Sequence, residues 1–186
     1  MPPKVHITKE AIVQTAVSLV RTQGADALNA RAIALELGCS TQPIFSNFAT
    51  MDALRQAVVV AAEILSQDYI DREMARAEYP PYKASGMAYI RFAKEEKELF
   101  KLLYMRDRTR EVIPEETDLT NQMQSYVQDQ TGLAGNEAKL FHLEMWAYVH
   151  GIAVMLATDY LDLDWSLVSK MITDAYQGLK KQFERK

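Results

Sequence analysis

The segment 29–48 constrains the fold more than any other part of the chain, because its pattern is typical of two short helices joined by a glycine turn. Asn29 is a residue type that caps helices, and Ile33 and Leu37 follow it at helical spacing on one apolar face. Gly38 ends the first helix, because glycine adopts at little cost the left-handed conformation that often follows a helix. The segment therefore predicts a helix, a sharp turn and a second helix.

The second helix is predicted to have a polar outward face. Ser40 is placed to cap it, and Pro43 falls in its first turn, where a missing backbone N–H removes no intrahelical hydrogen bond. Ile44, Phe45 and Phe48 are the apolar residues expected to anchor this helix. The remaining side chains are short and polar, and we expect them on the outer side: Thr41, Gln42, Ser46 and Asn47.

A helix, a glycine turn and a helix with an outward face of Gln, Asn, Ser and Thr are what a helix-turn-helix protein presents to the DNA major groove. Gln and Asn can pair in bidentate fashion with adenine edges, and hydroxyls can reach base edges or phosphates. The alternative interpretation is an ordinary helical hairpin within a helical core, because glycine-turned helix pairs are common.

Helical periodicity continues through the rest of the chain, and no segment shows the alternation expected of a strand. Thr8 is placed to cap a first helix that Gly24 ends, and Thr50 to cap a fourth helix that runs towards Tyr79. The sequence therefore predicts an all-α fold. Further helices are expected over about residues 83–96, 97–104, 115–131, 137–160 and 165–183.

Charge is distributed unevenly along the chain, and it supports a division into two domains. Residues 1–55 carry five Lys and Arg against four Asp and Glu, whereas residues 56–186 carry 16 against 21. The sign of this difference suits a DNA-facing end attached to an acidic body. We therefore expect a helix-turn-helix DNA-binding domain over 1–55 and a helical effector-binding and dimerisation domain over 56–186.

Between Thr8 and Leu54 the order of features resembles the N-terminal domain of the tetracycline-repressor (TetR/AcrR) family of bacterial transcriptional regulators. The matching pieces are ITKEAIVQTAVSLVRTQGADALNARAIALELGCS, TQPIFSNF and ATMDAL. Phe45 stands where the family usually has a tyrosine that touches the DNA backbone, and Met51 where it usually has a phosphate-contacting lysine. The DNA-binding residues expected here are Thr8, Asn29, Arg31, Ser40, Thr41, Gln42, Pro43, Phe45, Ser46 and Asn47.

The C-terminal part resembles the domain of one branch of this family, called WHG after the element formed here by Trp146, His150 and Gly151. The last two predicted helices each have a broad apolar face, which favours a four-helix bundle completed by a second subunit. Bulky apolar side chains with polar tips are typical of a small-molecule cavity, although for any single residue plain core is the favoured interpretation. The expected lining is Phe92, Phe100, Leu103, Tyr104, Met123, Tyr126, Met145, Trp146 and His150.

These features predict a homodimeric, ligand-responsive repressor that binds a palindromic operator and responds to a small, largely apolar effector. The sequence contains no metalloprotease motif, phosphate-cradling glycine loop or nucleophile elbow, so we expect neither an enzyme nor a cofactor. We also expect no membrane segment and a cytoplasmic location. Two alternatives stay open. Phe45 and Met51 are compatible with a small-molecule-binding helical protein with degenerate DNA-binding specificity. The other alternative is a DNA organiser without an effector, which should lack an enclosed cavity.

Overall fold

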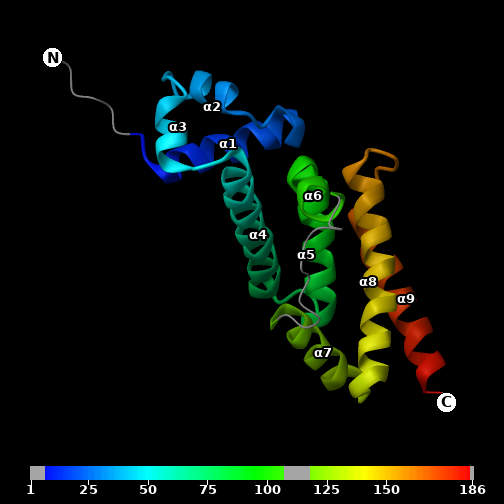
Figure 1. Ribbon diagram of the computed structural model, residues 1–186. Helices are drawn as coiled ribbons and strands as arrows, with labels where there is room; N and C mark the ends of the chain where they lie inside the picture. Colours follow the sequence, from blue (N-terminus) through cyan, green and yellow to red (C-terminus); the bar gives the residue numbers. More distant parts are fainter. Residues whose placement is uncertain (1–6, 107–117, 185–186) are drawn as a thin grey trace. The chain divides into compact units, whose positions relative to one another are not determined.

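The computed structural model describes residues 7–106 and 118–184, and these residues form helices and no strands (Figure 1). The predicted all-α fold is therefore confirmed. A short 3₁₀ turn, η1 (Ala25–Ala27), was not expected from the sequence. The α-helices are α1 (Lys9–Gln23), α2 (Ala30–Glu36), α3 (Gln42–Asn47), α4 (Met51–Arg76), α5 (Pro81–Glu95), α6 (Lys97–Tyr104), α7 (Asp118–Thr131), α8 (Gly135–Ala157) and α9 (Trp165–Phe183).

The helices form two compact units, and the chain passes between them at two points within the described residues. The first unit contains residues 7–67 and 96–106, and the second contains residues 68–95 and 118–184. Helix α4 therefore contributes to both units, while the chain returns to the first unit between α5 and α6. The functional boundary near residue 55 stays a prediction.

The first unit is built around α1, which packs against α2, α3 and α6. Its core is apolar and closed, because each of these helices turns one stripe of large side chains inward. Ile12 on α1, Ile33 on α2 and Ile44 on α3 have no exposed surface. Outside this core, the Arg21 guanidinium donates two hydrogen bonds to the Glu96 carboxylate, at 2.6 and 2.8 Å. This pair joins α1 to the residue that precedes α6.

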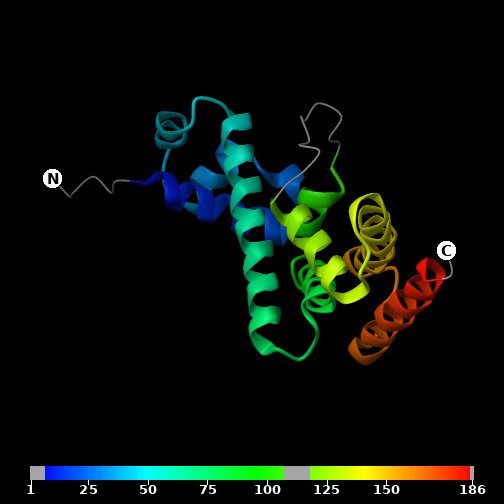
Figure 2. The ribbon, with the colours of Figure 1, turned by 90° about the horizontal axis from the view of Figure 1, so that it is seen from below.

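The second unit is built around the contact of α5 with α8, and α7 and α9 pack against the same two helices (Figure 1; Figure 2). Phe92 on α5 and Phe141 on α8 are fully buried there. The ring of Phe141 meets the ring of Phe183 on α9 edge to face, with centroids 5.7 Å apart. Aromatic side chains therefore fill much of the space between these helices.

Helix α8 is the one helix within the described ranges that is long and apolar enough to cross a bilayer by length and composition. Such a helix was not expected from the sequence. Its 23 residues include Phe141, Met145 and Ile152, which are buried against neighbouring helices of the unit. A core helix of a water-exposed domain meets the same criteria, because it too is apolar around much of its circumference.

The predicted helix caps are largely observed. The Thr8 and Thr50 side chains accept hydrogen bonds from backbone N–H groups of Ala11 and Ala53, both at 3.1 Å, as helix caps do. Ser40 does not cap α3, because α3 begins one residue later than expected, and Thr41 occupies the capping position without a side-chain bond. Such one-residue shifts are common at short helices, where several polar residues compete for the cap.

The turn after α2 generates a prediction. Gly38 has a φ of +62°, and a Cβ added there would meet nothing within 4 Å. Gly38→Ala should therefore destabilise the protein through backbone strain alone, by about 1–2 kcal/mol. Urea unfolding at a fixed protein concentration measures this loss.

Gly86→Ala is the matched control, because Gly86 lies inside α5 with an ordinary backbone and its new Cβ would meet Val149 at an acceptable 3.5 Å. This variant should be as stable as the wild type or more stable, since alanine favours helix over glycine. A Gly38→Ala protein as stable as the wild type would contradict the strained turn.

Candidate functional site

The turn between α2 and α3 has the hydrogen bonds of a Schellman motif. The N–H of Gly38 donates to the Leu35 carbonyl at 3.1 Å, and the N–H of Cys39 donates to the Ala34 carbonyl at 2.9 Å. These bonds satisfy carbonyls that the end of a helix would otherwise leave unpaired. The left-handed backbone at Gly38 then redirects the chain into α3.

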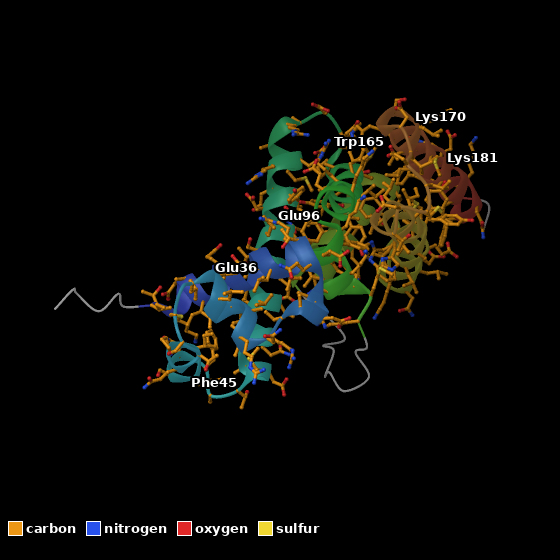
Figure 3. All side chains as sticks on the ribbon, turned by 90° about the horizontal axis from the view of Figure 1, so that it is seen from above. Glu36, Phe45, Glu96, Trp165, Lys170 and Lys181 are labelled. Atoms are coloured by element: carbon orange, nitrogen blue, oxygen red, sulfur yellow. The ribbon has the colours of Figure 1, made fainter. Side chains whose placement is uncertain are left out.

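Helix α3 is anchored by two side chains and exposes a third. Ile44 has no exposed surface, and Phe48, just after the helix, is 4% exposed. Phe45 was expected to help anchor the helix, but it is 51% exposed. The correction has a geometric cause, because residues one position apart on a helix point about 100° away from each other. Figure 3 shows Phe45 at the periphery of the first unit.

Two of the polar side chains on α3 are engaged within the protein. The Ser46 hydroxyl donates to the Gln42 carbonyl at 2.9 Å. The Asn47 amide donates to the Pro43 carbonyl at 2.8 Å and to the Ile7 carbonyl at 3.4 Å. The Gln42 side chain is exposed and makes no hydrogen bond to another described residue. These side chains therefore differ in how freely they can meet a ligand.

The other predicted DNA-binding residues lie in the same unit. Asn29 caps α2, since its Oδ1 accepts from the N–H groups of Arg31 and Ala32 at 3.1 and 3.0 Å. Arg31 is exposed and forms no ion pair within residues 7–106 and 118–184, whereas Arg55 pairs with Asp52 at 2.8 Å. Positive charge is sparse on α2 and α3, because Arg31 is the one Lys or Arg within residues 29–48.

The nine predicted ligand-binding residues are divided between the two units. Phe100, Leu103 and Tyr104 belong to α6 in the first unit, and the rings of Phe100 and Tyr104 lie 5.0 Å apart. The other six belong to the second unit: Phe92, Met123, Tyr126, Met145, Trp146 and His150. Within that unit the Trp146 ring is 43% exposed and stacks on His150 at 4.9 Å.

Two tyrosine–histidine pairs join α5 to α8. The Tyr82 hydroxyl lies 3.0 Å from Nδ1 of His142, and the Tyr89 hydroxyl lies 2.8 Å from Nδ1 of His150. Burial lowers the pKa of both histidines and raises the pKa of Tyr82. Each histidine therefore favours its neutral form, which a buried helix contact accommodates more easily than a charge.

A buried carboxylate in the second unit was not anticipated from the sequence. Glu73 on α4 is only 2% exposed, and its Oε2 accepts from Arg76 at 3.1 Å and from Arg91 at 3.2 Å. The Arg91 guanidinium also lies over the Trp165 ring, 4.2 Å from its centroid. The Oε1 atom of Glu73 is buried and has no hydrogen-bond partner among residues 7–106 and 118–184. An unpaired buried carboxylate oxygen is a strong acceptor for any donor that reaches it.

No signal in the sequence alone locates this cluster, because Glu73 and Arg91 are 18 positions apart on different helices. The tyrosine–histidine pairs have a weak signal. Tyr82 and Tyr89 are seven residues apart, and His142 and His150 are eight apart, which are the spacings of side chains on one helix face. Among residues 7–106 and 118–184, no group of three His, Cys, Asp or Glu side chains is placed to hold a metal ion.

Comparisons with known proteins agree with this geometry. Residues 82–174 match the family model described as "Tetracyclin repressor-like, C-terminal domain". No curated protein has a sequence that matches the chain. Three solved structures have similar folds over nearly the whole length of both chains.

The first is a protein of unknown function from Rhodococcus sp. RHA1, with 23% identity, a TM-score of 0.73 and coverage of 98% of each chain. The second is a TetR-like transcriptional regulator from the same organism, with 13% identity, a TM-score of 0.68 and coverage of 96% of this chain and 98% of that one. The third is a putative transcriptional regulator from Pseudomonas aeruginosa PAO1, with 12% identity, a TM-score of 0.72 and coverage of 99% and 95%.

The half-buried histidine of the Tyr82 pair, His142, generates a pH prediction. Burial lowers the pKa of His142 below its ordinary 6.5, so the unfolded chain binds a proton at a higher pH than the folded chain does. The free energy of unfolding should therefore fall as the pH drops from about 6.5 towards the lowered value. Unfolding by urea at a series of pH values measures the slope.

His142→Asn is the informative variant, because its amide can still hydrogen-bond with the Tyr82 hydroxyl but does not titrate. Its unfolding free energy should depend less on pH in this window than that of the wild type. Equal slopes in the two proteins would exclude His142 as a source of the pH dependence.

Proposed function

The chain belongs to the tetracycline-repressor-like family of transcriptional regulators, and from this premise we propose that it is a homodimeric repressor that binds a palindromic operator and is controlled by a small effector. Membership of the family implies a ligand-responsive regulator that binds DNA. The main support for operator binding is the form of α3, a short helix held by a Schellman turn with an exposed, uncharged outer face. We also propose that the protein acts in the cytoplasm.

Each subunit lays residues 41–48 in a major groove of the operator. The dimer axis then places two half-sites about 34–36 Å apart, or a multiple of that distance, on a roughly palindromic sequence. Base contacts come from the exposed part of α3, where Gln42 has a free amide. Thr41, Pro43, Ser46 and Asn47 complete the surface that meets the groove.

Phosphate contacts come from the starts of three helices. The donors are backbone N–H groups that follow Thr8, Asn29 and Ser40, apart from those of Ala11, Arg31 and Ala32, which already donate to the capping side chains. The exposed guanidinium of Arg31 adds a charge. Because few cations are available here, we expect the salt dependence of binding to be shallower than for a strongly basic domain.

The dimer forms through α8 and α9. Leu140, Leu143 and Trp146 on α8 are 43%, 56% and 43% exposed, and Leu167 on α9 is 45% exposed. Leu140 and Leu143 are three residues apart, so they lie on one face of α8. Exposed apolar side chains of this size are costly in water, and a second copy of the same face would bury them.

A small, largely apolar effector binds in the second unit, with Phe92, Met123, Tyr126 and Met145 as candidate lining residues. Phe100, Leu103 and Tyr104 on α6 belong to the first unit and are left out of this set. Glu73 lies in the same unit, and a donor on the effector that reached its buried Oε1 would meet an acceptor with no hydrogen-bond partner among the described residues. The effector favours a protein state with lower affinity for the operator, and such coupling is commonly worth about 1–3 kcal/mol.

Selection of bound sequences from a random duplex pool, at a stated salt concentration, tests the operator proposal. The purified protein should enrich a palindromic consensus, and Gln42→Ala should bind that consensus about tenfold or more weakly, the cost of one bidentate base contact. Gln128→Ala is the matched control, because Gln128 is an exposed glutamine on α7 in the other unit, and it should bind normally. No enrichment by folded, dimeric protein would favour the small-molecule-binding alternative.

Sedimentation of a charged variant tests the dimer face. Leu143→Glu should convert the protein to a monomer at micromolar concentration, because the carboxylate would have to be buried in an apolar interface. Val60→Glu is the matched control, since Val60 on α4 is 51% exposed and lies outside the proposed face. A Leu143→Glu protein that remains dimeric would place the interface elsewhere.

A further inference from the structure

The recognition surface of α3 contains few groups that are free to read a base. The helix is QPIFSN and has no charged residue. The hydroxyl proton of Ser46 and the amide protons of Asn47 are directed to backbone carbonyls of the same unit, at 2.9 Å for Ser46 and at 2.8 and 3.4 Å for Asn47. Gln42 and Phe45 remain as the exposed side chains of α3 without such a bond.

Phe45 is 51% exposed. It is an apolar ring on a helix face whose other exposed side chains are polar. Base edges in the major groove present hydrogen-bonding groups and one kind of apolar group, the 5-methyl of thymine. Phe45 lacks the hydroxyl with which the family's usual tyrosine can hydrogen-bond to the DNA backbone, so its ring has only apolar contacts to offer. We propose that Phe45 reads a thymine methyl in each half-site and is a main determinant of operator sequence. This inference rests on the proposed DNA binding and adds a base-specific contact to it.

The spacing of the two side chains also predicts how the bases are arranged. Gln42 and Phe45 are three positions apart, so they lie on the same face of α3, about 4.5 Å apart along its axis. Consecutive base pairs are about 3.4 Å apart along DNA. The adenine that pairs with Gln42 is therefore within one or two base pairs of the thymine that Phe45 contacts.

A polar neighbourhood argues against a protein partner for Phe45. Protein-binding patches are extended and apolar at their centre, whereas the exposed side chains beside Phe45 on α3 are Gln42 and Ser46. A single ring among hydrogen-bonding groups matches a thymine edge, where one methyl lies beside the O4 acceptor and the amino group of the paired adenine.

Replacing thymine by deoxyuridine tests the inference, because it removes the 5-methyl and keeps the base pair. The operator duplex comes from the sequence selection, and each thymine is replaced in turn in both half-sites. One position per half-site should lower the affinity of the wild type by about fourfold per methyl, the value of burying one such group. The other thymines should change the affinity little.

The variants then assign that loss to Phe45. Phe45→Ala should bind the thymine and deoxyuridine duplexes equally at this position, whereas Phe45→Tyr keeps the ring and should keep the discrimination. Leu35→Ala is the matched control, because Leu35 is an exposed apolar residue on α2, at 81%. It should discriminate as the wild type does.

The outcomes separate this inference from the proposed function. If the wild type binds the selected duplex but no thymine replacement weakens it, the methyl contact is refuted while operator binding stands. The same holds if Phe45→Ala still discriminates thymine from deoxyuridine. If no duplex is selected by the folded protein, the proposed DNA binding itself is refuted. Phe45 is half-exposed, so Phe45→Ala leaves no buried cavity, and its urea unfolding midpoint should match that of the wild type.

Discussion

The left-handed backbone at Gly38 is the constraint on which the DNA-facing surface depends. It lets the Schellman bonds close α2, and it sets the direction in which α3 leaves the turn. With α3 in that direction, Ile44 and Phe48 share one face, four positions apart, and fill the core. Phe45 is then forced outward by the period of the helix. One glycine therefore decides both which side chains stabilise the unit and which one remains exposed.

The second unit depends on α8, which is apolar on more sides than the described neighbouring helices α5, α7 and α9 cover. Its inner side packs against α5, where the two tyrosine–histidine pairs add hydrogen bonds to an otherwise apolar contact. Its outer side leaves Leu140, Leu143 and Trp146 in water. The same composition makes α8 similar to a membrane span and suited to a subunit interface. Its buried inner face and the family of the chain favour the interface.

Local features of the sequence predicted much of the fold, because caps and turns depend on neighbouring residues. Thr8 and Gly38 act as expected for this reason. Contacts between distant residues could not be predicted in this way. The bond from Asn47 to the Ile7 carbonyl spans 40 positions, and the pair of Glu73 with Arg91 spans 18. Both depend on how helices pack, so the sequence suggested which residues are polar on α3 but not which of them are free.

Control of DNA binding by an effector requires a physical connection between the units, and the described chain provides two. One is the continuous helix α4, and the other is the step from Glu95 to Glu96. Glu96 is only 12% exposed and holds Arg21 of α1 through two hydrogen bonds, so the point at which the chain re-enters the first unit is tied to α1. Exposed ion pairs are worth at most about 1 kcal/mol, but bidentate, partly buried ones contribute more. Because the Arg21 side chain is 46% exposed, this pair alone reaches only the lower end of a coupling of about 1–3 kcal/mol.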